Sequence, residues 1–343
     1  MIYEALERIY QSCKNEVKLN NDKLSISIYY SNLKYINSDR IKGVFNSYEN
    51  LYPYLKRSLE FDLYFLPYDY YKNTLHFILK EESQIPHIIL ENKKIVDELV
   101  KLGFNLSMGY VNFGLFDNFF WFSLTRRNTL FLVDKKNTKL FIITNINEDV
   151  ILRWLLDDIL MWYGKDIFPI HSSAIFSKHK CFIFAGPPHV GKTTLLLKGM
   201  KKGYTPLSDD ILWIDSKMKI RWCLPYIHIK NSDERIILDS KYKAINFRND
   251  LPIIMFILQK NIFEKIVRID KDKALILLEK YGGIYRYLSE YSIWVTYLIN
   301  NMKNPCKSLW EKKDKIHAMI TKFVNNKIDE VYTGGSHDAE NFL

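Results

Sequence analysis

The sequence predicts an α/β fold with a phosphate-binding core, preceded by an α+β region. The first observation is the stretch FAGPPHVGKTT at residues 184–194, where two glycines bracket four residues and lysine and threonine follow directly. The second is its context, because a strand-like apolar segment precedes it and a helical pattern follows it. The third is a pair of adjacent aspartates, Asp209 and Asp210, just before the next apolar segment.

The composition is that of a globular protein. The chain has 343 residues, of which 48% are hydrophobic and 26% charged, so it is long enough for a sizeable core and two domains. No apolar run approaches the roughly 18 to 20 residues that cross a bilayer. The first residues, MIYEALERIYQSCKNE, are amphipathic and acidic early, unlike a signal peptide. We therefore expect a cytoplasmic protein without a membrane partner.

Cysteines, histidines and charge exclude or weaken several classes. Cys13, Cys181, Cys223 and Cys306 are far apart, which argues against a disulfide framework and a zinc site. The eight histidines lack the paired helical spacing of a metal site. The formal net charge of +10 is spread along the chain, which fits plain composition or an anionic ligand such as a nucleotide phosphate. No basic-aromatic motif of an RNA-binding module is present, so nucleic acid is the weakest partner.

Residues 1–147 are predicted to form a variable α+β N-terminal domain. The stretch EALERIYQSC has apolar residues at helical spacing, and LSISIYY alternates like a half-buried strand. TLFLV and KLFIITNI flank DKKNT, which is typical of a hairpin. The many aromatic residues of this region either build its core or offer a docking surface for a peptide.

Residues 148–330 are predicted to form the second domain. Asn147 begins a helix with two acidic residues in its first turn, and Gly164 ends it. FPIHSSAIFS, CFIFA and ILWID are predicted strands, and TTLLLKGMKKG is a predicted helix closed by Gly203. RWCLPYIHI and PIIMFIL are expected as buried strands, and DKALILLEK and YSIWVTYLINNM as helices. Residues 331–343 lack apolar periodicity, so a mobile C-terminal tail is expected.

The glycine-bracketed stretch matches the pattern G-x-x-x-x-G-K-[ST], which holds nucleotide phosphates. Glycine is needed where the backbone approaches the phosphates closely, and the following helix adds the partial positive charge of its N-terminus. In this pattern Lys192 reaches the β and γ phosphate oxygens and the Thr193 hydroxyl completes the shell of a magnesium ion. The residues predicted to bind the nucleotide are Gly186, Pro187, Pro188, His189, Val190, Gly191, Lys192, Thr193 and Thr194.

The aspartate pair has two interpretations. Ser208, Asp209 and Asp210 suit a solvated turn, because serine and aspartate favour turns. Adjacent carboxylates repel each other, however, and beside a phosphate loop a bound cation would stabilise both. One carboxylate would then bind magnesium while the other accepts the proton of an attacking hydroxyl. We favour this second interpretation because the pair follows the loop at the edge of the next strand.

Two histidines lie near the loop in the sequence. His171 is in the apolar stretch FPIHSSAIFS, where a lone histidine is usually a core residue with its own hydrogen-bond partner. If that strand neighbours the loop strand, His171 instead faces the nucleotide phosphates. His189 lies inside the loop and points either to solvent or onto the nucleotide.

The segments HSSAIF, FAGPPHVGKTTLLLKG and YTPLSDDILWI together resemble the catalytic core of HPr serine kinase-like proteins. That family is marked by a histidine on a strand, then a G-x-x-x-x-G-K-[ST] loop, then paired aspartates at the start of the next strand. The resemblance covers roughly residues 150–230. It implies the compact α/β core that these kinases share with phosphoenolpyruvate carboxykinases.

The resemblance also implies a role for each site residue. Asp209 would be the catalytic base, while Asp210 and Thr193 would hold magnesium. Lys192 would bind the β and γ phosphates, and His171 would assist near the transferred phosphoryl group. The roles of the two aspartates could be exchanged.

Two departures separate the chain from true HPr kinases. Pro188 and His189 replace small residues of the loop, and Thr193-Thr194 replaces the Ser-Glu of those kinases. The second change favours the looser relatives, which resemble tailoring kinases of peptide natural products such as lasso peptides. Those relatives often carry a variable part before the core, as this chain does.

Motifs and resemblance together predict an ATP- and Mg²⁺-dependent kinase acting on a serine or threonine hydroxyl of a peptide or small protein. A small-molecule kinase is one alternative, and a P-loop ATPase or nucleotide switch without an acceptor is another. The sequence leaves open the acceptor, the preference between ATP and GTP, the reversibility of the reaction, and the oligomeric state, including a homo-oligomer.

Overall fold

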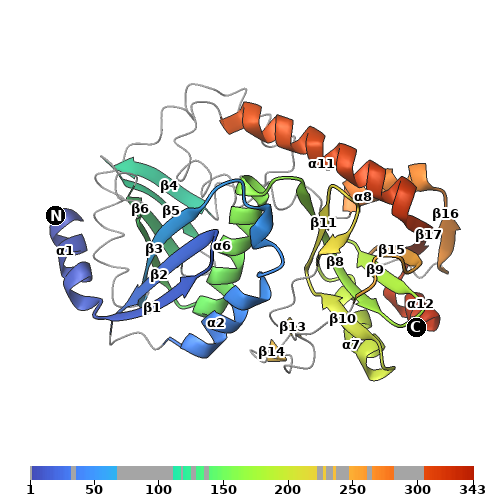
Figure 1. Ribbon diagram of the computed structural model, residues 1–343, viewed down its shortest axis with the longest axis horizontal. Helices are drawn as coiled ribbons and strands as arrows, with labels where there is room; N and C mark the ends of the chain where they lie inside the picture. Colours follow the sequence, from blue (N-terminus) through green and yellow to red (C-terminus); the bar gives the residue numbers. More distant parts are fainter. Residues whose placement is uncertain are drawn as a thin grey trace. The chain divides into compact units, whose positions relative to one another are not determined.

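Figure 1 shows the computed structural model, a mixed α/β protein with two mixed sheets and several helices. The structure describes residues 2–31, 36–67, 111–116, 119–124, 129–134, 139–221, 227–228, 235–236, 247–260, 265–281 and 305–343. The chain divides into two compact units, the first including Met1–Asn46 and Leu55–Tyr163 and the second including Ser47–Tyr54, Gly164–Leu288 and Ser308–Leu343.

The division falls after helix α6 (Glu148–Tyr163) and not at the expected boundary between residues 147 and 148. The preceding strand β7 (Lys139–Thr144) ends just before this helix, so the connection between them is short. Buried residues occupy most positions of α6, which ties the helix to the unit that contains β7.

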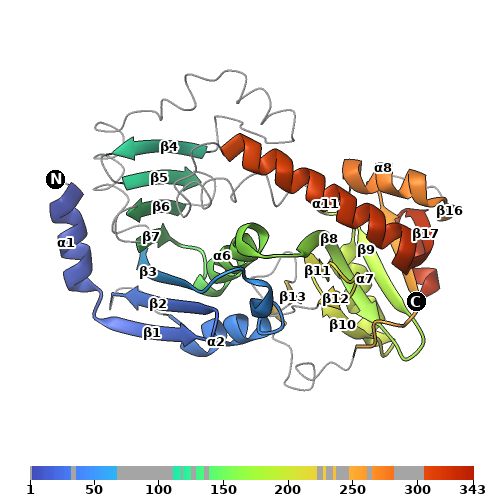
Figure 2. The same ribbon diagram turned by 45° about the horizontal axis from the view of Figure 1, so that its top comes forward.

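The first unit is built on a seven-stranded sheet in the order β1-β2-β3-β7-β6-β5-β4 (Figure 2). The pairs β2–β3 and β3–β7 are parallel, and the other pairs are antiparallel. The expected hairpin is confirmed, because Thr129 of β6 pairs with Thr144 of β7 and their hydroxyls lie 2.7 Å apart. The remaining elements are α1 (Ile2–Ser12), β1 (Asn15–Asn20), β2 (Leu24–Tyr30), α2 (Ser38–Ser47), β3 (Leu59–Pro67), β4 (Val111–Phe116), β5 (Phe119–Leu124) and β6 (Thr129–Asp134).

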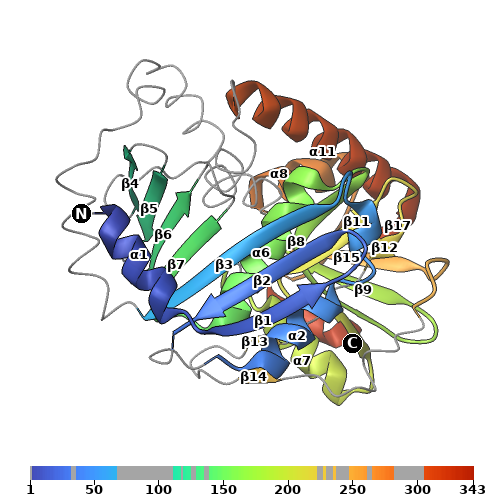
Figure 3. The ribbon, with the colours of Figure 1, turned by 60° about the vertical axis from the view of Figure 1, so that its left-hand side comes forward.

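Helix α1 and strand β2 follow the patterns that predicted them. Tyr10 of α1 packs edge-on against Tyr64 of β3 and Phe141 of β7, with ring centroids 5.1 and 5.5 Å apart. Along β2, buried and partly exposed residues alternate, as a strand with one covered face requires. In Figure 3, α6 lies behind β2 and β3.

The second unit is built on an eight-stranded sheet with the main path β12-β11-β8-β9-β15-β17-β16. Strands β9, β15 and β17 run parallel, whereas β8 is antiparallel to β9. Strands β10 and β11 pair one after the other along the remaining edge of β8. The strands are β8 (Ile167–Phe176), β9 (Cys181–Ala185), β10 (Thr205–Ser208), β11 (Ile211–Asp215), β12 (Ile220–Arg221), β15 (Ile253–Leu258), β16 (Val267–Ile269) and β17 (Ile328–Gly334).

Two helices of this unit were expected from the sequence, and both are present in the described residues. Helix α7 (Lys192–Lys201) follows the loop, and Gly203 adopts φ 89° just after it. Helix α8 (Lys271–Tyr281) covers the stretch DKALILLEK. The other elements are η1 (Tyr52–Tyr54), the two-stranded pair β13 (Ile227–His228) and β14 (Arg235–Ile236), α11 (Pro305–Lys327), α12 (Ser336–Ala339) and η4 (Glu340–Phe342).

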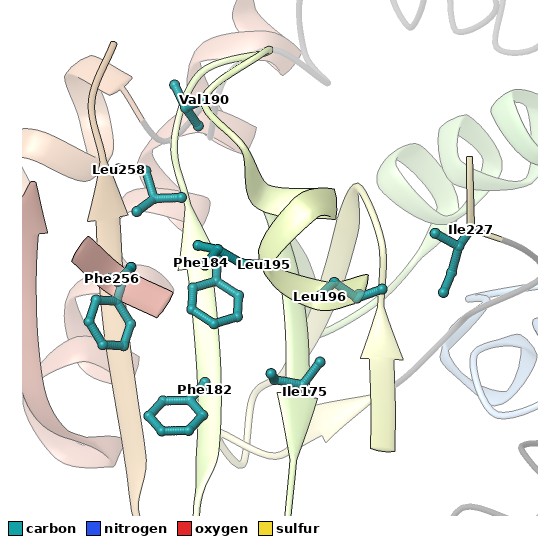
Figure 4. Packing of buried hydrophobic residues seen from close by; sticks show 10 residues of the cluster. Ile175, Phe182, Phe184, Val190, Leu195, Leu196, Ile227, Phe256 and Leu258 are labelled. Atoms are coloured by element: carbon teal, nitrogen blue, oxygen red, sulfur yellow. The ribbon is translucent and has the colours of Figure 1, made fainter. Parts of the chain in front are cut away.

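Apolar side chains fill the space between the sheet and helix α7 (Figure 4). The rings of Phe184 of β9 and Phe256 of β15 stack with centroids 5.6 Å apart. Leu195 and Leu196 of α7 are fully buried in the same cluster. Each such side chain contributes about 1.5–3 kcal/mol on burial, so the core holds both ends of the loop between β9 and α7.

The expectation that residues 331–343 form a mobile tail is wrong. Residues up to Gly334 belong to β17, which pairs with β15 on one edge and β16 on the other. The rest forms α12 and η4, where Phe342 packs against Phe256 with ring centroids 5.1 Å apart. The segment buries its apolar residues without helical periodicity because they come from a strand, a single helical turn and a 3₁₀ turn in succession.

Some expectations lie outside the described residues. These are the helix YSIWVTYLINNM at 291–302 and most of the strand RWCLPYIHI at 221–229. None of the helices in the described part of the chain has the length and apolar character needed to span a bilayer.

Candidate phosphate-binding site

The loop between β9 and α7 needs its two glycines. Gly186 has φ 149° and Gly191 has φ 96°, values that side chains rarely allow. A Cβ on Gly186 would lie 2.6 Å from the carbonyl oxygen of Leu258, and one on Gly191 would lie 2.6 Å from Oγ of Ser336. The loop therefore packs tightly against the end of β15 and the start of α12.

The loop bends around Lys192, the first residue of α7. Its side chain is buried, and Nζ donates hydrogen bonds of 2.9 Å to the carbonyl oxygens of Gly186 and Pro187. The ammonium group is thus held inside the turn, where the motif requires it. The carbonyl of Gly191 accepts the hydrogen bond of Leu195 N at 3.0 Å, so the helix starts directly from the loop.

The other loop residues differ in exposure. Val190 is buried in the core cluster beneath α7, which anchors the tip of the turn. His189 is exposed and has φ 71°, a conformation that histidine adopts more readily than bulkier side chains. Pro187 and Pro188 are half-buried, and Thr194 is exposed. Of the two threonines after Lys192, Thr193 is therefore the one turned toward the protein.

Asp209 receives two hydroxyl hydrogen bonds. Thr193 of α7 and Ser173 of β8 each donate to Oδ1 of Asp209 at 2.9 Å. The carboxylate is 4% exposed, so it lies in the site and not on a solvated turn. The Thr193 contact brings the glycine-bracketed loop and the aspartate pair together.

Asp210 faces the other way, toward His171. Nε2 of His171 lies 3.0 Å from Oδ1 of Asp210, and the side chains are 2% and 52% exposed respectively. Asp210 has φ 85°, a left-handed conformation that costs energy in any residue with a side chain and tends to occur at functional sites. The carbonyl of Asp210 accepts a 3.1 Å hydrogen bond from Ser172 N, which fixes this conformation against β8.

Strand β8 provides the frame for these contacts. His171 pairs with Ile211 at the start of β11, and Ser172 pairs with Ala185 at the end of β9. Residues two apart on a strand face the same side, so His171 and Ser173 both face α7 together with Ile175 of the core cluster. His171 is buried and has a partner in Asp210, as expected of a core histidine, and its strand does neighbour the loop strand β9, the condition for the second interpretation. That His171 faces nucleotide phosphates stays a prediction.

The far end of β11 is fixed by Asp215. Burial alone would raise the pKa of this carboxyl. Hydrogen bonds from Lys219 N, the Arg221 guanidinium and the Tyr54 hydroxyl lower the pKa by more than burial raises it, so the net pKa is below the usual value. Asp215 therefore stays ionised and ties β11 to β12 and to η1. Because the aspartate pair lies directly before β11, this anchor limits where the pair can move.

The arrangement provides hard oxygen donors of the kind that magnesium prefers. The Thr193 hydroxyl and the Asp209 carboxylate lie beside the loop that would hold the phosphates. Within the described residues, no group of three or more His, Cys, Asp and Glu side chains could hold a metal alone.

Sequence reasoning missed two residues of the site. Ser173 is two positions after His171, and this spacing on a strand was the available signal for a second inward polar group. The contact of Ser336 with Gly191 had no such signal, because most of the sequence of the second unit separates the two residues. No protein-family model and no curated protein matches this chain.

Proposed function

We propose that the protein is an ATP- and Mg²⁺-dependent kinase that transfers the γ-phosphoryl group to a serine or threonine hydroxyl of a peptide or small protein. The observation that carries the proposal is the hydrogen bond from Thr193 to Asp209, which joins a glycine-bracketed loop to an acidic pair. Positioning and charge neutralisation are the main requirements of phosphoryl transfer, and this group of residues can provide both.

The phosphates would be held by the loop and by the start of α7. Backbone N–H groups of a loop between a strand and a helix N-terminus favour anions. Lys192 would exchange its contacts with the Gly186 and Pro187 carbonyls for the β and γ phosphate oxygens. This exchange keeps the ammonium group hydrogen-bonded in both states, so the cost of binding is small.

The contacts support the exchanged assignment of the two aspartates. Asp209 shares a hydrogen bond with Thr193, the residue whose hydroxyl would bind magnesium, so Asp209 would lie on the metal side. Because the Thr193 hydroxyl donates its proton to Asp209, its oxygen lone pairs remain available to a cation. When bound, Mg²⁺ would neutralise charge on the β and γ phosphates.

Asp210 is then the residue placed to accept the acceptor's proton. Its side chain is 52% exposed, so a substrate hydroxyl can reach it, and His171 holds it at 3.0 Å. The acceptor oxygen attacks the γ phosphorus, the bond to the β–γ bridging oxygen breaks, and the hydroxyl proton passes to Asp210. The products are the phosphorylated acceptor and ADP, with the proton released afterwards to solvent.

A protein or peptide acceptor is favoured by the resemblance to HPr serine kinase-like proteins. The same trio of histidine strand, loop and paired aspartates acts on a serine hydroxyl in that family. The departure at Thr193-Thr194 favours the looser relatives, which resemble tailoring kinases of other peptides.

Incubation of the full chain with γ-labelled ATP and Mg²⁺ tests the proposal. Three parallel reactions contain a mixture of serine- and threonine-containing peptides, free serine and threonine, or no acceptor. The proposal expects label on a peptide hydroxyl, located by mass spectrometry, and no transfer with the Lys192→Ala variant, because Lys192 binds the phosphates.

The other outcomes contradict the proposal in distinguishable ways. Label on free serine or threonine alone would indicate a small-molecule kinase. Inorganic phosphate as the sole labelled product, at the same rate with and without peptide, would indicate an ATPase or nucleotide switch. ATP that remains intact in all reactions, with no Mg²⁺-dependent nucleotide binding by calorimetry, would remove the nucleotide site itself.

A further inference from the structure

The acidic residues and the histidine lie on one side of the loop strand. In the sheet order β11-β8-β9-β15-β17, His171 and Ser173 come from β8, and the aspartate pair joins β10 to β11. Thr193 reaches Asp209 on this same side. The proposed metal, and with it the β and γ phosphates that it would bridge, therefore belongs over β8.

Different residues lie on the opposite side of the loop strand. Because β9, β15 and β17 are parallel, their carboxyl ends meet at the edge of the sheet where the loop starts. Leu258, the last residue of β15, lies against Gly186, and Ser336, just after β17, lies against Gly191. Ligands of open α/β sheets bind outside the carboxyl ends of the strands, and here that edge extends beyond the loop.

This opposite side is firmly built. Gln259 N donates to the carbonyl of Gly334 at 3.1 Å, so the ends of β15 and β17 are linked. Lys198 of α7 forms an ion pair with Glu340, and the Tyr204 hydroxyl donates to the carbonyl of Leu343 at 3.2 Å. Figure 4 shows the cluster beneath α7 continuing from β9 onto β15. Ser336 is thus held next to the loop by a segment anchored on α7.

We propose that the nucleoside half of the nucleotide lies over the carboxyl ends of β15 and β17, beside Ser336. The inference rests on the proposed nucleotide site and adds the direction in which the nucleotide lies. With the β and γ phosphates drawn toward β8 by Thr193 and Asp209, the α phosphate and ribose leave the loop on the other side. Ser336, at Gly191, offers a hydroxyl to the ribose there.

Photolabelling of the full chain with 8-azido-ATP and with 8-azido-GTP, each with Mg²⁺, tests the direction. We expect label, located by mass spectrometry, on residues 258–260 or 334–338, and we expect excess unmodified nucleotide to prevent it. Label protected by nucleotide but located on any other segment, such as 171–177 or 209–213, overturns the proposal. Absence of any protected label, together with absence of nucleotide binding by calorimetry, overturns the proposed nucleotide site as well.

A substitution gives a second, independent measurement. Ser336→Ala keeps the Cβ that packs on Gly191 and removes only the hydroxyl. We expect it to weaken ADP binding about 3- to 10-fold, the effect of one lost hydrogen bond, and to leave the binding of inorganic tripolyphosphate unchanged. Equal weakening of both ligands means that Ser336 only supports the loop and contradicts the proposal, as does no change for either. Ser216→Ala, on an exposed turn of the same unit, is the matched control.

Discussion

The hydroxyl of Thr193 donates a 2.9 Å hydrogen bond to Oδ1 of Asp209, and this contact joins the start of α7 to the junction between β10 and β11. The two residues are 16 positions apart, across a whole helix and a strand. A turn of aspartates facing solvent would not make this contact. The two neighbouring carboxylates therefore have different partners, because Asp209 contacts Thr193 whereas Asp210 contacts His171.

The two aspartates are expected to fail differently when each is changed to asparagine. Asp209→Asn should weaken Mg²⁺-dependent nucleotide binding by about 10-fold or more, because a buried group beside the proposed metal position loses its charge. Asp210→Asn should leave nucleotide binding nearly unchanged and lower the transfer rate by about 10²- to 10⁴-fold, the usual contribution of a general base. Calorimetry with and without Mg²⁺ and single-turnover transfer separate the two effects. The reverse pattern would restore Asp209 as the base.

Ser173 is expected to position Asp209 without contacting the substrate. Ser173→Ala removes one of the two hydroxyl donors to Oδ1, so the apparent affinity for Mg²⁺ should fall several-fold while the turnover at saturating Mg²⁺ changes less. Ser173→Thr keeps a hydroxyl and should restore part of the affinity. The measurement is the Mg²⁺ dependence of nucleotide binding.

Ser172→Ala is the matched control for Ser173. Ser172 is equally buried on the same strand, but its hydroxyl donates to the carbonyl of Ile170 at 3.3 Å and not to an acid. We expect this variant to bind Mg²⁺ and nucleotide like the native chain. An identical loss of Mg²⁺ affinity in both variants would mean that any substitution in β8 weakens binding. That result would contradict a positioning role for Ser173.

Asp215 is expected to make stability depend on acid pH. Its pKa in the folded protein is lower than the unfolded value of about 3.9, so the stabilisation is present above about pH 4 and is lost as the pH falls through the folded-state pKa. Asp215→Asn should lower the free energy of unfolding at pH 7, and the difference from the native chain should narrow below about pH 4. Urea titrations over this range measure it.

Asp250→Asn serves as the comparison for Asp215. Asp250 also pairs with an arginine, Arg248, but both side chains are exposed. Exposed ion pairs contribute little, so the variant should unfold like the native chain at every pH. If the two variants have the same free energy of unfolding at each pH, burial does not explain the contribution of the Asp215 ion pair to stability.

Phe342 is expected to stabilise the second unit although it lies in the segment that looks mobile in the sequence. Its ring contacts Phe256 and Tyr332 with centroids 5.1 and 5.0 Å away. Phe342→Ala should lower the free energy of unfolding by about 1–3 kcal/mol, less than for a fully buried phenylalanine. His337→Ala, whose side chain is 95% exposed, should have no effect in the same thermal or urea experiment.

Local patterns predicted the elements around the loop well. The strand before the loop, the helix after it and the strand after the aspartate pair were placed because each has its own periodicity and the turns between them are short. A contact between the loop and the acids was also expected, because the acid pair follows the loop at the edge of the next strand. In these places sequence neighbours become structural neighbours.

The remaining features depend on contacts between distant residues. Asp210 has a left-handed backbone, and Ser173 donates a hydrogen bond to Asp209. Both features depend on the pairing of β8 with β11, which residue spacing alone does not reveal. The packing of residues 331–343 depends on β15, to which they are not linked locally. A glycine pair at Gly334 and Gly335 looks like a flexible end until its neighbours are known.

The position of β17 has a consequence for biosynthesis. This strand lies between β15 and β16, although both of them precede it in the chain. A nascent polypeptide in which the loop and α7 are already synthesised therefore still lacks the strand that pairs with both β15 and β16. Pairings of such high contact order form late, so this side of the sheet is completed only after residues 328–334 have left the ribosome, and until then the edge of β15 that β17 covers stays unpaired.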